Sequence, residues 1–262
     1  MSAGAAVRTL PGGLTCTRPQ PDPALRLVCL PYAGGGPHTY RRWPAALAPA
    51  LEVWTLSLPG RAGHSDADLE VRWPQLVTGV AESIARRLGG PVVLFGHSLG
   101  ALVAFEVARA LTAAGHPPLH LFVSGRAAPA QLAALPWIAL PADDMALLDE
   151  LDRRYGGVPA AVRDNPELLA WFLPSIRADL ELLAGYRYRP GRLHCPITAC
   201  TGVDDREASP AQLRGWAAET TGPVTTRVFD GGHFYLTESE GALMPLLRAL
   251  VPGQEGSRDG TV

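Results

Sequence analysis

The chain contains 262 residues, of which 47% are hydrophobic, and its formal net charge at pH 7 is −2. This length and composition allow one globular domain with a large core. The near-neutral charge, with arginines that are frequent but scattered, argues against a nucleic acid or an anionic membrane surface as the main partner.

The cysteines and the N-terminus limit the function further. The cysteines are Cys16, Cys29, Cys195 and Cys200. None of them belongs to a Cys-x-x-C pair, so we expect neither a zinc nor a redox site, and no bound metal. The first 23 residues hold no apolar segment long enough for a signal peptide or a membrane span. We therefore expect a cytoplasmic protein with reduced thiols.

In chain order, residues 1–24 come first, and their proline and glycine content predicts an arm that is either flexible or held against the surface. Apolar runs then predict strands at 25–31, 53–59, 92–95 and 119–125. Helical periodicity predicts helices at about 39–50, at 73–88 and directly after residue 98. Residues 25–126 therefore alternate strand and helix, which predicts a mostly parallel sheet flanked by helices.

The pattern changes over residues 127–190, where no strand-like run occurs. Helical spacing covers 141–157 and 165–186, and Asn165-Pro166 resembles a helix cap with proline at the first helical position. An all-helical insertion of this length is too long for a simple connection between strands, so it predicts a lid over a site. A peripheral helical decoration is the alternative.

The sheet pattern resumes over residues 191–251. Strands are predicted at 195–202 and 225–231, and helices at 210–220 and 241–251. The polar tail, 252–262, is predicted to be flexible. The whole pattern predicts an α/β fold whose sheet is interrupted once by a helical lid.

The segment Gly-His-Ser-Leu-Gly at 96–100 stands where an apolar strand passes directly into a helix. Gly96 and Gly100 remove Cβ atoms where strand and helix approach closely, and Ser98 would project from the tip of the turn. This is the G-x-S-x-G nucleophile elbow of the α/β-hydrolase fold. From these five residues alone, a glycine-rich turn with a serine cap is the alternative.

A serine hydroxyl needs a base and an orienting acid before it can act as a nucleophile near neutral pH. In α/β-hydrolases these follow in the order Ser, Asp, His, on loops after later strands. His233, in "DGGHFYL" after the last strand, is the predicted base. Asp205, in "TGVDDRE", is the predicted acid, because hydrolases of this type usually show Gly-x-x-Asp here and Gly202 begins that spacing. Asp204 is its competitor.

Acyl transfer also requires N–H donors for the oxyanion of the intermediate. Leu99, the residue after the proposed nucleophile, is expected to provide one. The glycine-rich loop "LPYAGGG" at 30–36 is expected to provide the second, from Ala33, because glycines let the backbone turn its N–H groups inward. No Lys-Ser/Thr pair follows this loop, which disfavours a phosphate-binding loop.

From Leu25 to Leu250 the chain resembles the type II thioesterases, stand-alone α/β-hydrolases that accompany modular polyketide and nonribosomal peptide synthases. The motifs that carry the resemblance are "LPYAGGG", "LPGR", "GHSLGA", "GGHFYL" and the helical stretch from "LLDELDRRYGG" to "LLAGYRY". All α/β-hydrolases share the elbow, whereas the lid segment, "LPGR" and "GGHFYL" are more specific. After "LPGR" the sequence continues "AGHSD", where relatives often have further charged residues, so the details of that loop stay open.

The resemblance implies that Ser98, Asp205 and His233 hydrolyse acyl groups from the phosphopantetheine arm of an acyl or peptidyl carrier protein, clearing stalled or misprimed synthases. It implies no cofactor of the enzyme's own, and we expect a monomer. The lid side chains expected to cover an apolar acyl chamber are Trp171, Phe172, Leu173 and Ile176. A small-molecule esterase, an acyltransferase on the same fold and a catalytically silent synthase-binding protein are the alternatives.

Overall fold

The computed structural model describes residues 6–58, 71–132, 140–156 and 163–251. Its strands are β1 (Arg8–Leu10), β2 (Leu14–Cys16), β3 (Arg26–Leu30), β4 (Glu52–Leu56), β5 (Val92–His97), β6 (His120–Ser124), β7 (Ile197–Gly202) and β8 (Val224–Phe229). Its α-helices are α1 (Trp43–Leu47), α2 (Trp73–Ser83), α3 (Leu99–Ala113), α4 (Pro129–Leu132), α5 (Asp144–Tyr155), α7 (Pro166–Ala184), α8 (Pro210–Leu213), α9 (Tyr235–Glu238) and α10 (Glu240–Arg248).

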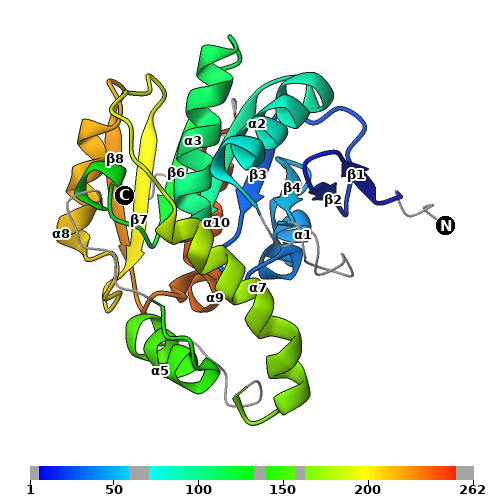
Figure 1. The fold of residues 1–262 in the computed structure, drawn as a ribbon. Helices are drawn as coiled ribbons and strands as arrows, with labels where there is room; N and C mark the ends of the chain where they lie inside the picture. The colour runs from blue at the N-terminus through cyan, green and yellow to red at the C-terminus, as the bar shows by residue number, and fades with distance from the viewer. Residues whose placement is uncertain (1–5, 59–70, 133–139, 157–162, 252–262) are drawn as a thin grey trace, which may run out of the picture.

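The eight strands form one sheet in the order β1-β2-β4-β3-β5-β6-β7-β8, with helices on both faces (Figure 1). The pairs β1–β2 and β2–β4 are antiparallel, and the five other neighbouring pairs are parallel. The predicted α/β-hydrolase fold is thereby confirmed. In the described part of the chain, no helix combines the length and the apolar character needed to cross a membrane.

Two apolar layers enclose the sheet, because successive side chains of a strand point to opposite faces. On one face, α2 and α3 pack on the strands, with Phe105 of α3 in the same cluster as Leu94 of β5. On the other face, α1, α9 and α10 contribute to a cluster around Phe95. The central strand β5 is therefore buried on both sides, and the segment that follows it is held rigidly.

Of the two alternatives for the N-terminal segment, the described residues show an arm held against the protein and not a flexible one. Residues 8–16 form the antiparallel pair β1–β2 at the sheet edge. Gln20 is also fixed, since its backbone N–H donates to Glu52 Oε1 at 2.9 Å and its side-chain amide donates to the Leu51 carbonyl at 2.7 Å. A buried carboxylate needs partners, and the fully buried Glu52 finds them in Gln20, Trp54 and Arg26. This requirement holds the segment in place.

Between β6 and β7 the described residues form the helices α4, α5 and α7, so the all-helical insertion is present. Figure 1 shows α5 and α7 together at one end of the sheet. Leucines of α5 and α7 pack in one cluster, and Asp144 pairs with Arg177 at 2.7 Å, which joins the two helices. The predicted lid residues 133–139 and 157–162, and the predicted tail 252–262, lie outside the described residues.

Candidate active site

Ser98 stands between β5 and α3 in a backbone conformation that few non-glycine residues adopt. Its φ is 55°, and it is the one non-glycine residue with a positive φ among those the structure describes. A Cβ on Gly96 would lie 2.1 Å from the Gly100 carbonyl oxygen, and a Cβ on Gly100 would lie 2.1 Å from the Leu30 oxygen. Both positions therefore require glycine, and the turn has the geometry of a nucleophile elbow.

His233 and Asp205 follow β8 and β7, and their side chains meet beside this elbow. His233 Nδ1 and Asp205 Oδ2 are 2.9 Å apart, and both residues are buried. Asp205 Oδ1 accepts hydrogen bonds from the backbone N–H groups of Glu207, at 2.9 Å, and Ala208, at 3.2 Å. The competing candidate, Asp204, is exposed. The carboxylate of Asp205 is thus fixed and orients the imidazole.

Burial and hydrogen bonding act in opposite directions on Asp205. Burial alone would raise the pKa of its carboxyl group. The hydrogen bond from His233, the charge of that ring and the bond from the Glu207 N–H outweigh burial and hold the pKa below its ordinary value. Asp205 is therefore ionised at neutral pH, as the acid that orients a catalytic histidine must be.

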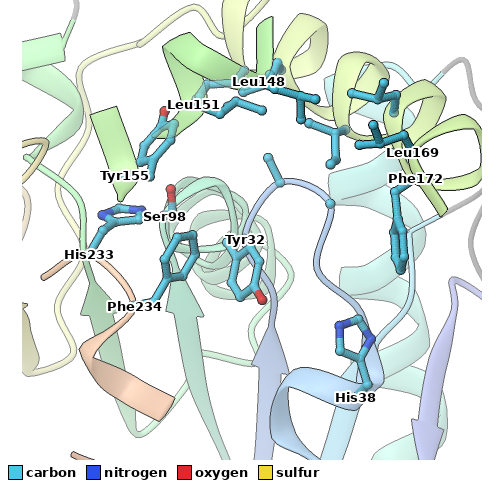
Figure 2. Close-up of a pocket in the computed structure, with 16 residues that line it drawn as sticks. Tyr32, His38, Ser98, Leu148, Leu151, Tyr155, Leu169, Phe172, His233 and Phe234 are labelled. Atoms are coloured by element: carbon cyan, nitrogen blue, oxygen red, sulfur yellow. The ribbon is translucent and has the colours of Figure 1, made fainter. Parts of the chain in front are cut away.

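A cavity of about 180 Å³ opens beside Ser98 and His233, and both side chains line it. Figure 2 shows the His233 imidazole next to the Ser98 hydroxyl, with the Tyr155 ring close to both. The far wall comes from the two lid helices, with Leu148 and Leu151 from α5 and further apolar side chains from α7. The serine therefore faces an apolar chamber closed by the lid, which suits the hydrocarbon part of an acyl group.

Three of the four predicted lid residues, Phe172, Leu173 and Ile176, line this cavity. Trp171 does not: its side chain is 63% exposed, and its ring packs edge-on against Phe172 with centroids 4.6 Å apart. Consecutive residues of a helix point about 100° apart, so a residue next to a cavity-lining one can face solvent. Trp171 is therefore not among the side chains that line the chamber in this structure.

The loop after β3 contains a tight turn whose N–H groups have different partners. The Gly35 N–H donates to the Tyr32 carbonyl at 2.8 Å, and the Gly34 N–H donates to Asp179 Oδ2 at 2.7 Å. Among the described residues, none accepts a hydrogen bond from the Ala33 N–H. The Ala33 amide is therefore available to a ligand, whereas those of Gly34 and Gly35 are not.

The other predicted oxyanion donor, Leu99, is the first residue of α3. The first N–H groups of an α-helix have no acceptor within the helix, so they can bind a developing negative charge. Ala33 and Ser98 line the same cavity. The Ala33 loop therefore lies at the same cavity as Ser98, and Leu99 directly follows Ser98 in the chain, at the start of α3.

Two side chains outside the predicted site, Tyr155 and His97, also contact His233; from the sequence, His97 is expected to be structural. The Tyr155 ring, at the end of α5, has its centroid 4.7 Å from that of His233. The His97 ring lies on another side, with centroids 4.9 Å apart, and its Nδ1 is 2.8 Å from Ser124 Oγ. The position of His97 next to the nucleophile elbow in the sequence indicates that it lies near the site. Nothing in the sequence marks a single tyrosine on a lid helix as a neighbour of His233.

His97 is fully buried in this cluster. Burial, and next the neighbouring His233, hold the pKa of His97 well below its ordinary value. The ring is therefore neutral at neutral pH and adds no positive charge beside the candidate base.

Comparison with known proteins agrees with this geometry. The thioesterase-domain family model matches residues 25–250. The chain is 36% identical over 219 residues to the gramicidin S biosynthesis protein GrsT of Aneurinibacillus migulanus, an alignment covering 82% of this chain and 84% of that protein. It is 38% identical over 223 residues to thioesterase PikA5 of Streptomyces venezuelae, covering 84% and 78%.

Among solved structures, the type II thioesterase BorB from the borrelidin biosynthetic cluster aligns with a TM-score of 0.81 and 37% identity, over 91% of this chain and 97% of that one. Fold and site together define a thioester hydrolase of the α/β-hydrolase class. The chain belongs to the thioesterase-domain family, and its resemblance to the type II thioesterases is confirmed.

Proposed function

We propose that this enzyme hydrolyses acyl groups from the phosphopantetheine arm of acyl or peptidyl carrier domains, and so edits polyketide or nonribosomal peptide synthases. The observation that carries the proposal is Ser98 beside an imidazole that Asp205 orients, at an apolar cavity under the lid. The relatives support the choice of partner, since GrsT is named for gramicidin S biosynthesis and BorB for a borrelidin cluster.

In the acylation step, Ser98 Oγ attacks the thioester carbonyl carbon while His233 Nε2 takes the hydroxyl proton. The negative charge moves to the carbonyl oxygen, where the N–H groups of Leu99 and Ala33 stabilise it. The intermediate then collapses and the carbon–sulfur bond breaks. The imidazolium returns the proton to the leaving thiolate, and Asp205 stabilises the imidazolium while it exists.

Deacylation repeats the same chemistry with water as the nucleophile. Water attacks the acyl-serine carbonyl as His233 takes one of its protons, and the same two N–H groups bind the oxyanion. Collapse breaks the bond to Ser98 Oγ, which recovers the proton from His233 and releases the carboxylic acid. The cycle balances without any group beyond these side chains and water, so we propose that the enzyme needs no cofactor.

A thioester on a carrier arm has an apolar acyl part and a polar pantetheine part, and the protein offers a cavity for each. A second cavity, of about 270 Å³, shares Tyr155, His233 and Phe234 with the apolar one. Arg153 and Arg206 are among the residues that line it. We assign the acyl chain to the apolar cavity and the carrier arm to the second one.

We also propose that the enzyme works as a monomer in the cytoplasm. Its four cysteines are unpaired and buried, as is usual where thiols stay reduced. Burial raises the pKa of Cys29 and of Cys200, which keeps both groups in the unreactive thiol form.

An acyl carrier protein loaded with a short acyl group tests the proposal, with the mass of the intact carrier reporting acyl release. Ser98→Ala should lower the rate by a factor on the order of 10⁴ or more, because the remaining groups cannot form the acyl-enzyme. Equal rates for wild type and variant would contradict the mechanism. A nitrophenyl ester of the same acyl group is the comparison, and faster turnover of that ester than of the carrier thioester would indicate a small-molecule esterase instead.

A further inference from the structure

The turn at residues 32–35 has a backbone conformation that glycine makes possible. The Gly35 N–H donates to the Tyr32 carbonyl at 2.8 Å, and Gly34 at the third position has a φ of +78°. Ala33, at the second position, is not among the residues with positive φ. These are the features of a type II turn. In a type I turn the central peptide, between Ala33 and Gly34, is rotated by roughly half a turn.

A lid side chain holds this central peptide. Asp179 of α7 is buried, with 4% of its surface exposed, and its Oδ2 accepts from the Gly34 N–H at 2.7 Å. The two residues are 145 positions apart in sequence. Ile176, about one helical turn earlier, packs directly on the same residue, since a Cβ on Gly34 would lie 2.5 Å from Ile176 Cγ1. The lid helix therefore contacts the turn through one polar and one apolar group.

We propose that Asp179 is a positioning residue, which fixes the turn at residues 32–35 so that the neighbouring Ala33 N–H faces the reacting carbonyl oxygen. This inference rests on the proposed function, in which Ala33 is an oxyanion donor. It adds that the oxyanion site is complete when α7 is seated on the turn. When the lid helix packs over an acyl group, the same movement then completes the set of N–H donors for the oxyanion.

The physical reason is the low intrinsic preference of the turn. Glycine adopts positive and negative φ about equally, so the Ala33–Gly34 peptide has no strong preference for the observed orientation. The Gly34 N–H donates to Asp179 Oδ2 at 2.7 Å, and this hydrogen bond favours the observed orientation of the peptide. The N–H of Ala33 belongs to the preceding peptide, so Asp179 acts on it by anchoring the turn that carries it, and withdrawal of α7 would remove that anchor.

Two substitutions of Asp179 test the inference on acyl carrier protein thioesters. Asp179→Ala removes the acceptor and should lower kcat about tenfold or more with little change in KM, because loss of one oxyanion donor typically costs about 10²–10³ in kcat. Asp179→Asn keeps an acceptor oxygen for the Gly34 N–H and should recover most of the lost kcat. The control is Asp144→Ala, which breaks the ion pair between α5 and α7 without touching the turn and should keep the wild-type kcat.

A binding measurement separates positioning from a general weakening of the fold. An acyl trifluoromethyl ketone forms a tetrahedral adduct with Ser98 whose oxygen occupies the donor site, whereas the corresponding acyl amide of pantetheine binds without forming one. Asp179→Ala should weaken trifluoromethyl ketone binding about tenfold or more and leave amide binding unchanged. A merely structural role would weaken both ligands alike, or neither, and that result would overturn the inference.

A variant on the turn itself makes the test independent of the folding of the Asp179 variants. Gly34→Ala disfavours a φ of +78° and should show the same selective loss of kcat and of trifluoromethyl ketone binding. If the wild type hydrolyses the thioester and both Gly34→Ala and Asp179→Ala keep the wild-type kcat, the positioning role is overturned while the proposed function stands. Absence of hydrolysis in the wild type would instead overturn the proposed function.

Discussion

At the scale of single residues, the site depends on one fixed carboxylate. Asp205 is buried, yet it stays ionised because His233 and two backbone N–H groups bind its oxygens. An ionised acid on the Nδ1 side keeps the other ring nitrogen free to accept the proton of Ser98. His97, held neutral on another side of the ring, adds no charge that would oppose protonation of His233.

Asp205→Asn should lower kcat by about 10³–10⁴-fold, because an amide favours the wrong tautomer of His233 and cannot stabilise the imidazolium. Steady-state hydrolysis of a carrier-bound thioester measures this loss. Asp204→Asn, at the exposed neighbouring carboxylate, is the matched control and should stay near the wild-type rate. A larger loss of kcat in the Asp204 variant than in the Asp205 variant would show that Asp204, and not Asp205, is the acid.

The same substitution should change how stability depends on pH. The pKa of Asp205 in the folded state lies below its ordinary value of 3.8, so its ionised form stabilises the fold above about pH 4. That contribution is lost as the pH falls through the lowered folded-state pKa. In urea unfolding, the deficit of Asp205→Asn should therefore be present at neutral pH and shrink in acid below pH 3.8. A deficit that grows as the pH falls would contradict this assignment.

At the scale of elements, the junction of β5 and α3 is tightly packed. The strand is buried on both faces, and the helix begins at the residue after Ser98. The backbone of α3 approaches the end of β3 so closely that no side chain fits at Gly100. Packing between these elements therefore holds the strained Ser98 backbone, and local sequence preference does not.

Gly100→Ala should destabilise the fold by about 1–3 kcal/mol or more, because its Cβ would lie 2.1 Å from the Leu30 carbonyl oxygen. Gly79→Ala, in the middle of α2, is the matched control, since its Cβ would meet no atom within 4 Å. That substitution should stabilise the protein by about 0.5–1 kcal/mol through helix propensity. Urea unfolding of both variants measures the difference, and destabilisation of similar size in the two would refute the close approach.

The sequence was informative about elements that repeat a pattern and less so about short ones. Strands β3 to β8 and the helices α2, α3, α5 and α7 follow from apolar runs and helical spacing. The strands β1 and β2 have three residues each, which is too short for an alternation of apolar and polar residues to be recognised in the sequence. The buried carboxylate of Glu52 holds this segment in place, and that long-range contact is not visible in the sequence. The helix predicted over 39–50 is shorter, a 3₁₀ turn at Pro37–Tyr40 and then α1. Pro44 fits the first turn of a helix, so α1 begins beside it, and Ala48, the residue before Pro49, is extended and ends the helix.

At the scale of the whole molecule, the site is assembled from segments far apart in the chain. Motif order predicted Ser98 and His233 as a group with an aspartate after β7, because α/β-hydrolases keep a fixed order of these residues. The Gly-x-x-Asp spacing favoured Asp205 over its neighbour Asp204. The contacts of Tyr155 with His233 and of Asp179 with Gly34 were not predictable, since they depend on how the lid helices settle on the sheet. Helix α5 thus contacts a catalytic side chain, and α7 contacts the turn that carries the proposed donor Ala33. On our proposal, these contacts link the seating of the lid to the chemistry.

Trapping of the acyl-enzyme tests the central claim most directly. A carrier protein with an isotopically labelled acyl group is mixed with the enzyme in H₂¹⁸O, and the reaction is quenched in acid within the first turnover. Peptide mass spectrometry should find the acyl group on Ser98, and the released acid should carry one ¹⁸O atom from water. Release of acid while Ser98 is never acylated, or acylation of a different residue, would contradict the account.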